Sequence, residues 1–217
     1  MGANASGAEL AVPSQRRAMA IDADVDRISD GVANRPVESR PMRTFDELES
    51  LWSAMLPQPR DRGSVRLLTI RREPSVHETP VSVAMTVEGG LEGDRWAAGW
   101  RERDPERHAQ VTLMNASVTE LVAAGRQPLH EAGDNILVDF DISVDNLPAG
   151  TRLRVGEALL EISEVPHTGC SKFAARFGQD ALRWANWRHW RERRLRGVNA
   201  RVVEGGTVRV GDPIERL

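Results

Sequence analysis

Residues 152–163 read Arg-Leu-Arg-Val-Gly-Glu-Ala-Leu-Leu-Glu-Ile-Ser, and this stretch decides the fold class. Two apolar runs, Arg152–Val155 and Ala158–Ser163, are separated by Gly156-Glu157. A two-residue connection that contains glycine is typical of a β-hairpin, because glycine adopts the positive φ of a tight turn. The stretch therefore predicts an antiparallel pair of strands.

Further short β-rich segments lie on both sides of this hairpin, punctuated by Gly, Pro and Asp. They are Val65–Ile70, Val81–Val87, Gln110–Met114, Ile136–Val138, Val198–Val203 and Thr207–Val210. The last two flank Glu204-Gly205-Gly206 and predict a second hairpin. Many short strands at close spacing indicate a mostly-β (α+β) fold, with a compact β-barrel or sandwich and a few peripheral helices.

Three segments predict helices. Thr44 begins a capping box with Glu47, and apolar residues recur at helical spacing until Pro57. A second capping box, Ser117-x-x-Glu120, starts a short helix that ends at Gly125. The third helix spans Gln179–Leu195 and combines many arginines with a stripe of tryptophans at 184, 187 and 190.

The length of 217 residues fits one substantial domain plus an extension. We expect a disordered tail over residues 1–40, a helical extension over 41–63 and the β-barrel domain over 64–217. The apolar runs are too short to span a membrane, and no secretory signal is evident. Because a single cysteine cannot form an internal disulfide, a reducing cytoplasm is the expected compartment.

Charge and composition narrow the function classes. The formal charge of −3 gives no nucleic-acid signature. The 29 basic residues include one lysine, so any anion is bound mostly by guanidinium groups, which suit phosphate and carboxylate. The five histidines lack H-x-x-x-H spacing and only one cysteine is present, which argues against a closed zinc site.

The segment around Cys170 carries the most chemical information. It reads Pro-His-Thr-Gly-Cys-Ser-Lys-Phe over residues 166–173 and follows an apolar strand. Lys172 and Arg176 favour a thiolate, which attacks electrophiles, binds soft metals or carries sulfur. His167 lies close enough to tune the thiol or to move a proton. The alternative is that Cys170 is a small buried hydrophobic residue and His167 a structural one.

Other segments could bind an anion. Residues 89–95 form a glycine-dense turn that carries Asp94 and Arg95, and Gly133-Asp134-Asn135 opens into a strand. The basic 179–196 segment is either a lid over an anionic cofactor or an ordinary solvated face with packed tryptophans.

In their order and spacing, these elements resemble the MOSC domain, named from the C-terminal part of molybdenum-cofactor sulfurases. The resemblance covers residues 64–217. It is carried by the Cys170 loop and by residues 90–95, 110–113, 133–137, 150–156, 196–200 and 206–212. Two departures are Asp134, where the family often has Glu, and Gly169, where many members have proline or another residue.

The resemblance implies a MOSC-type β-barrel in which Cys170 binds molybdenum in a pterin cofactor or carries sulfur. Relatives reduce N-hydroxylated compounds, so it implies a molybdenum-cofactor-dependent oxidoreductase. The catalytic residues would be Cys170, His167 and Asp94, with Cys170 as the metal ligand. The expected cofactor-binding residues are Arg95, Asn135, Lys172, Arg176 and Arg183.

The expected partners are a small-molecule substrate and an external electron-donor reductase, since no flavin, haem or iron–sulfur motif is present. The first alternative is a sulfur or cofactor carrier that holds a persulfide on Cys170 and receives sulfur from a donor. The family is also associated with pyridoxal phosphate, but this chain shows no domain for it. The second alternative is a non-enzymatic binding module built on the arginine-rich segment.

Overall fold

The computed structural model describes residues 41–217, the side chain of Trp190 excepted. The tail predicted over residues 1–40 lies outside the described residues. Among the described residues, no helix is long and apolar enough to cross a membrane.

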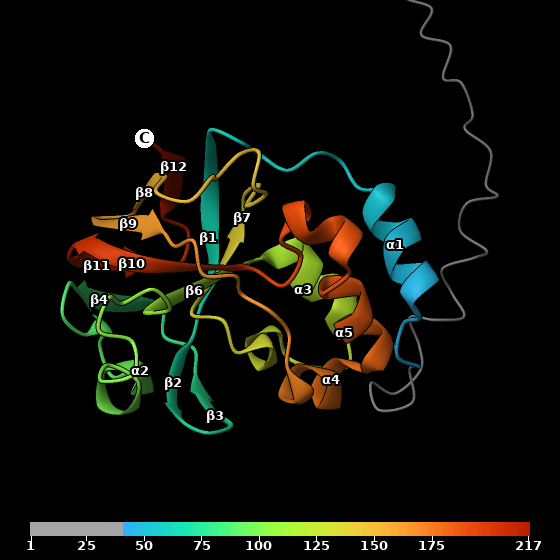
Figure 1. The fold of residues 1–217 in the computed structure, drawn as a ribbon, viewed down its shortest axis with the longest axis horizontal. Coiled ribbons are helices and arrows are strands. Elements are labelled where there is room, and N and C mark those ends of the chain that lie inside the picture. Colours follow the sequence, from blue (N-terminus) through green and yellow to red (C-terminus); the bar gives the residue numbers. More distant parts are fainter. Residues whose placement is uncertain (1–40) are drawn as a thin grey trace, which may run out of the picture. The chain divides into compact units, whose positions relative to one another are not determined.

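Seven strands close into a barrel in the order β1, β12, β8, β9, β10, β6, β7 (Figure 1). Their bounds are β1 (Arg62–Leu68), β6 (Val111–Asn115), β7 (Ile136–Asp139), β8 (Arg152–Val155), β9 (Ala158–Ile162), β10 (Val198–Glu204) and β12 (Pro213–Arg216). β6 and β7 are parallel, and the other neighbours are antiparallel. The predicted mostly-β barrel with few helices is confirmed.

The first predicted hairpin is confirmed, since β8 pairs with β9 and Val155 lies opposite Ala158. The second is wrong, because β10 pairs with β9 and β6, whereas β11 (Gly206–Arg209) pairs with β4 (Ser82–Thr86). The glycines at this connection, Gly205 and Gly206, allow close packing. A Cβ on Gly205 would lie 2.8 Å from the Met85 carbonyl oxygen, and one on Gly206 would lie 2.6 Å from the Glu157 carbonyl carbon.

Smaller elements surround the barrel. β5 (Gly90–Leu91) extends the β11–β4 sheet, and β2 (Ile70–Glu73) and β3 (Val76–Glu78) form a separate hairpin. Two short helices, α2 (Arg95–Gly99) and η2 (Leu129–Ala132), lie between strands. The sequence pattern did not predict the β2–β3 hairpin, β5, β12, α2, η2 or the helix Ser171–Phe177, because each is too short to show a period.

The remaining helices are α1 (Phe45–Ser53), α3 (Ala116–Ala123), α4 (Ser171–Phe177), α5 (Gln179–Ala185) and η3 (Arg188–Arg193), which gather on one side of the barrel (Figure 1). The capping box between Thr44 and Glu47 is confirmed. The predicted cap at Ser117 is wrong, because the side chain of Asn115 caps α3 and Ser117 lies inside it.

The long helix predicted over Gln179–Leu195 is also wrong. α5 ends at Ala185, and Asn186 and Trp187 separate it from η3. The predicted tryptophan stripe is therefore broken: Trp184 is fully buried, whereas Trp187 is 38% exposed. The side chain of Trp190 lies outside the described part of the chain.

The core has two parts that share strands β6 and β7. Leu113 and Ile136 belong to the barrel interior, whereas their neighbours Met114 and Leu137 pack among the helices. Because alternate residues of a strand point to opposite faces, both strands are buried on both sides. The barrel thus supports the helical layer, which includes α4 and the Cys170 loop.

Candidate functional site

Cys170 is the N-cap residue of α4 and is exposed. A side chain in this position faces backbone N–H groups that have no partner within the helix. Partial burial raises the pKa of the Cys170 thiol, but the backbone N–H groups of Phe173 and Lys172 outweigh it, aided by the charges of Arg196 and Lys172. The net effect lowers the pKa and favours the thiolate, as the sequence predicted for Lys172.

The loop that carries Cys170 is fixed by Asn186, at the end of α5. Its Oδ1 accepts a 2.8 Å hydrogen bond from the Gly169 N–H, and its Nδ2 donates a 3.1 Å bond to the Gly169 carbonyl. A Cβ at position 169 would lie 2.6 Å from Cδ1 of Leu182. Position 169 is a glycine because the loop packs directly on α5. Asn186, at the C-terminal end of that helix, holds the loop through these two hydrogen bonds.

A buried ion pair lies behind the Cys170 loop. Nη1 of Arg196 lies 2.6 Å from Oδ2 of Asp134, and Nη2 donates to the Ala132 carbonyl at 3.1 Å. The Arg196 guanidinium also sits 4.9 Å from the ring centroid of Phe173, on α4. Arg196 thereby links the start of β10, the loop before β7 and the helix that begins at Cys170.

His167 completes this group. Its Nδ1 lies 3.4 Å from Oδ1 of Asp134, and both atoms are buried without a hydrogen-bond partner among the described residues. Burial lowers the pKa of His167 well below its usual range, and the charges of Arg196 and Arg71 lower it further. His167 is therefore neutral near pH 7 and resists protonation, but an unprotonated ring nitrogen can accept a hydrogen bond. For His167 to deliver a proton, as the sequence predicts, the ring would first have to take one up.

A pocket of about 370 Å³ opens beside these residues. Its walls come from residues 163–168, residues 196–199 and the arginine-rich segment, including Arg191 and Arg194. The volume lies within the range of sites that hold small molecules. His167 and Arg196 line the pocket, whereas Cys170 is not a lining residue, although Thr168, two positions earlier, is.

Asp94, a predicted catalytic residue, is part of a saturated network. Its carboxylate accepts hydrogen bonds from the backbone N–H, Nε and Nη2 of Arg71, all at 2.9 Å, and from Nδ2 of Asn135 at 2.9 Å. Burial raises the pKa of Asp94, but the bonds and charge of Arg71 outweigh it and hold the pKa below its usual range. Asp94 has no proton to deliver near neutrality, and its geometry assigns it a structural role.

Asn135, a predicted cofactor-binding residue, has all its polar atoms occupied. Nδ2 donates to the Thr69 carbonyl and to Asp94, and Oδ1 accepts from the N–H and Oγ1 of Thr112. It is fully buried. Asn135 ties β6 and β7 to the start of α2 and offers no free group to a ligand.

The three predicted cofactor arginines differ. Arg95 is half-buried, and its pKa is lowered by burial and by the charges of Arg71 and Arg176; its side chain makes no direct hydrogen bond or ion pair within residues 41–217. Arg176 is held by Glu131, with Nε 2.8 Å from its carboxylate. Arg183 lies over the Phe45 ring of α1 and pairs with Asp180, so it is not brought to the Cys170 loop.

The sequence reasoning missed several residues that build the site. Arg71, Arg196 and Asn186 make its main contacts, yet no local motif separates these arginines from the other arginines of the chain. Asp134 lies in the Gly133-Asp134-Asn135 segment, which the sequence analysis singled out. Its buried pairing with Arg196, however, joins positions 62 residues apart. Such pairings become visible only when the strands are assembled.

The comparison with protein families decides the assignment, since the MOSC domain matches residues 105–215. The chain belongs to the MOSC domain family. The matched range includes Asp134, His167, Cys170 and Arg196, which are the residues around the pocket and the thiol. It excludes Asp94, which lies in the N-terminal part of the barrel domain.

Solved structures share the fold of this MOSC chain. The YuaD protein from Bacillus subtilis is 20% identical, with a TM-score of 0.52, and the alignment covers 74% of this chain and 98% of that one. YiiM from Geobacillus stearothermophilus is 16% identical, with a TM-score of 0.50 and coverage of 71% and 75%. No curated protein matches this chain. At these identities the likeness concerns the fold alone.

Proposed function

We propose that this MOSC protein binds a molybdenum cofactor through Cys170 and reduces N-hydroxylated or N-oxygenated small molecules. The observation that carries the proposal is the environment of Cys170. Its thiol is exposed at the start of α4, and neighbouring N–H groups and cations lower its pKa. A thiolate is the ligand form that soft metal centres select.

The residues present fit such a group. An anionic pterin phosphate needs cationic partners, and Arg95 is a half-buried guanidinium without a direct partner among the described residues. Lys172 adds an exposed ammonium two residues from the thiol. Arg176 is already engaged by Glu131, so its part is to support the site from outside. Arg183 is withdrawn from the proposed set because it faces α1.

The residues of this chain have distinct parts in the proposed reaction. When bound, the cofactor supplies the redox centre for a two-electron reduction. Cys170 would hold the metal, and neutral His167, which lines the pocket, would accept a hydrogen bond from the substrate's N–OH group. Two electrons from an external reductase and two protons convert R–NH–OH into R–NH2 and water. Because burial and nearby arginines keep the His167 ring unprotonated, the two protons come from solvent.

The test is metal and pterin content, measured on full-length protein from a host that makes the cofactor. Wild type is expected to contain near-stoichiometric molybdenum and pterin, and Cys170→Ser to lose the molybdenum. Arg95→Gln is expected to lower the pterin content, and Arg183→Gln serves as its matched control. Equal metal content in wild type and Cys170→Ser would overturn the proposal.

A second candidate is a sulfur or cofactor carrier with a persulfide on Cys170. It is favoured by one observation, that Cys170 is exposed and does not line the pocket. Turnover of a hydroxylamine with a chemical reductant distinguishes the two. Turnover lost in Cys170→Ser supports the reductase, whereas a persulfide mass increment on Cys170 without molybdenum or turnover supports the carrier.

A further inference from the structure

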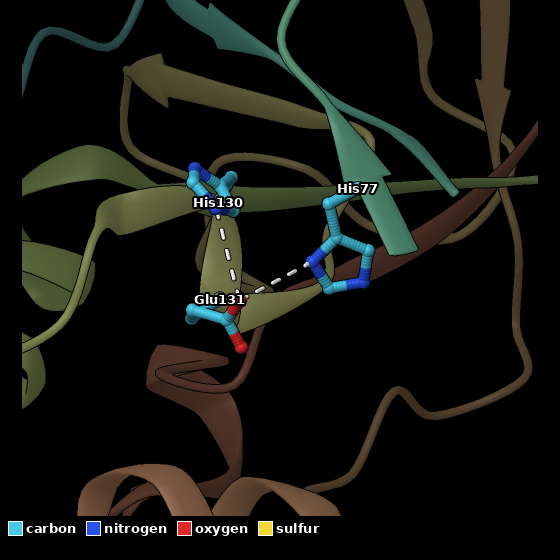
Figure 2. Close-up of side chains that lie close together, drawn as sticks. All are labelled: His77, His130 and Glu131. Atoms are coloured by element: carbon cyan, nitrogen blue, oxygen red, sulfur yellow. Dashed lines mark ion pairs between the residues drawn. The ribbon is translucent and has the colours of Figure 1, made fainter. Parts of the chain in front are cut away.

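A second group of chemically active side chains lies where the β2–β3 hairpin meets η2. His77 lies on β3, and His130 and Glu131 are successive residues of η2 (Figure 2). Figure 2 shows both imidazole rings directed at the same carboxylate. The proposed reductase reaction uses none of the three.

The distances within the group are too long for hydrogen bonds and suit an ion. Nδ1 of His77 lies 4.0 Å and Nε2 of His130 lies 3.7 Å from Oε1 of Glu131. The three ligand atoms all lie within 4.8 Å of one another. Because zinc bonds to histidine nitrogen and carboxylate oxygen at about 2.0–2.2 Å, one ion fits between them after small side-chain rotations.

His77 provides an independent sign of a missing partner. Its side chain is 4% exposed, and Nδ1 is buried without a hydrogen-bond partner in the described part of the chain. A buried polar atom without a partner destabilises the folded protein. Burial, together with the charge of Arg176, lowers the pKa of His77, so its ring is neutral, which is the form that binds metals.

The carboxylate is already oriented. Nε of Arg176 lies 2.8 Å from Oε2 of Glu131, and Nη1 donates to the Glu131 carbonyl at 2.8 Å. These contacts occupy one carboxylate oxygen and leave Oε1 to face the two histidines. Ligating carboxylates are commonly held by such outer contacts.

We propose that His77, His130 and Glu131 form a Zn²⁺ site with an open fourth position for water or an anionic oxygen. Two histidines and one carboxylate are a ligand set that zinc uses with one position open. The site is separate from Cys170. Its ligands come from β3 and η2, whereas Cys170 begins α4. The sequence spacing hid it, because His77 and His130 are far apart in the chain.

The experiment is a Zn²⁺ titration of the full chain carrying Cys170→Ser, which removes the thiol as a competing ligand. Calorimetry is expected to show one Zn²⁺ per chain. His130→Gln is the first variant, since His130 is 29% exposed and its replacement spares the core. His77→Gln is the second, and exposed His189→Gln is the matched control, with circular dichroism confirming that each variant folds.

Each histidine ligand variant is expected to weaken Zn²⁺ binding by about 100-fold or more, exceeding the cost of losing an outer-shell partner. The His189→Gln variant is expected to bind like its parent. Wild-type stoichiometry and affinity in either folded ligand variant would overturn the site, as would the absence of stoichiometric binding in the parent. None of these outcomes depends on molybdenum, so they leave the proposed reductase function to its own test.

Discussion

Two arginine–aspartate pairs meet at the segment before β7, and they differ in how completely their polar atoms are used. Asp94 is bonded by Arg71 and Asn135, and both of its oxygens accept hydrogen bonds. In the Asp134–Arg196 pair, Oδ1 of Asp134 and Nε of Arg196 are buried without hydrogen-bond partners among residues 41–217. Asp134 and Asn135 are adjacent in sequence, yet one belongs to each pair.

The Asp94–Arg71 pair is fully hydrogen-bonded and holds the structure together, whereas the Asp134–Arg196 pair has unpaired polar atoms beside the pocket. A buried charge network that satisfies every atom holds elements in place and has nothing left for a ligand. Unsatisfied buried polar atoms are uncommon in native structures, and each one needs an explanation. Beside the second pair lie the pocket and the Cys170 loop, so its unpaired atoms lie in the region that the proposed function uses.

The largest effect is expected for Asp94→Ala, which leaves Arg71 buried without its charge partner. Breaking a buried pair costs about 3–5 kcal/mol, so the free energy of unfolding should fall by that amount in urea titrations. Asp180→Ala is the control, because its pair with Arg183 is exposed and worth at most about 1 kcal/mol. Comparable losses in both variants would remove the structural role of Asp94.

Asp134→Asn should cost less, about 1–3 kcal/mol, because Arg196 keeps the Ala132 carbonyl and the Phe173 ring. The same urea titrations measure it. The contrast between the two pairs is refuted if this substitution destabilises the protein as much as Asp94→Ala does.

The pH dependence of stability should reveal His167. Because burial lowers its folded pKa, the folded state binds fewer protons than the unfolded state below the unfolded pKa of about 6.5. Stability is therefore expected to fall as the pH drops from 7 to 5, by at most about 1.4 kcal/mol per pH unit from this residue. His77 acts in the same direction, since its pKa is also lowered.

The measurement is the free energy of unfolding at pH 7 and pH 5, in wild type and in His167→Gln. The variant should lose less stability between the two values, and His77→Gln gives the share of the other histidine. An unchanged pH dependence in His167→Gln would show that His167 is not held neutral in the folded state.

The sequence predicted local features well and distant pairings poorly. The β8–β9 hairpin followed from Gly156-Glu157, and the α1 cap followed from Thr44 and Glu47, because each is decided within a few residues. The β10–β11 hairpin failed because a glycine pair that permits close packing looks like one that permits a turn. The helix break at Asn186 depends on the distant Gly169, which no local period reveals.

The candidate site shows the same limit. Cys170 stood out because its residue type is unique in the chain, and its prediction as the reactive residue remains to be tested. Arg71 and Arg196 did not stand out in the sequence, because an arginine that binds a buried aspartate has no distinguishing neighbours along the chain. Arg183 was a predicted cofactor-binding residue because it lies near Cys170 in the sequence. Its side chain instead points toward α1, where it lies over the Phe45 ring.

The smallest effect is expected for Arg196→Gln on the Cys170 thiol. Burial and the backbone N–H groups of Phe173 and Lys172 act on the pKa of Cys170 more strongly than the charge of Arg196 does. Removing that charge should raise the pKa by less than about one unit, or 1.36 kcal/mol. The pH profile of alkylation by iodoacetamide measures the shift, with Arg183→Gln as the control. If the two profiles coincide, Arg196 acts through the Asp134 pair and the packing of α4 rather than through the thiolate.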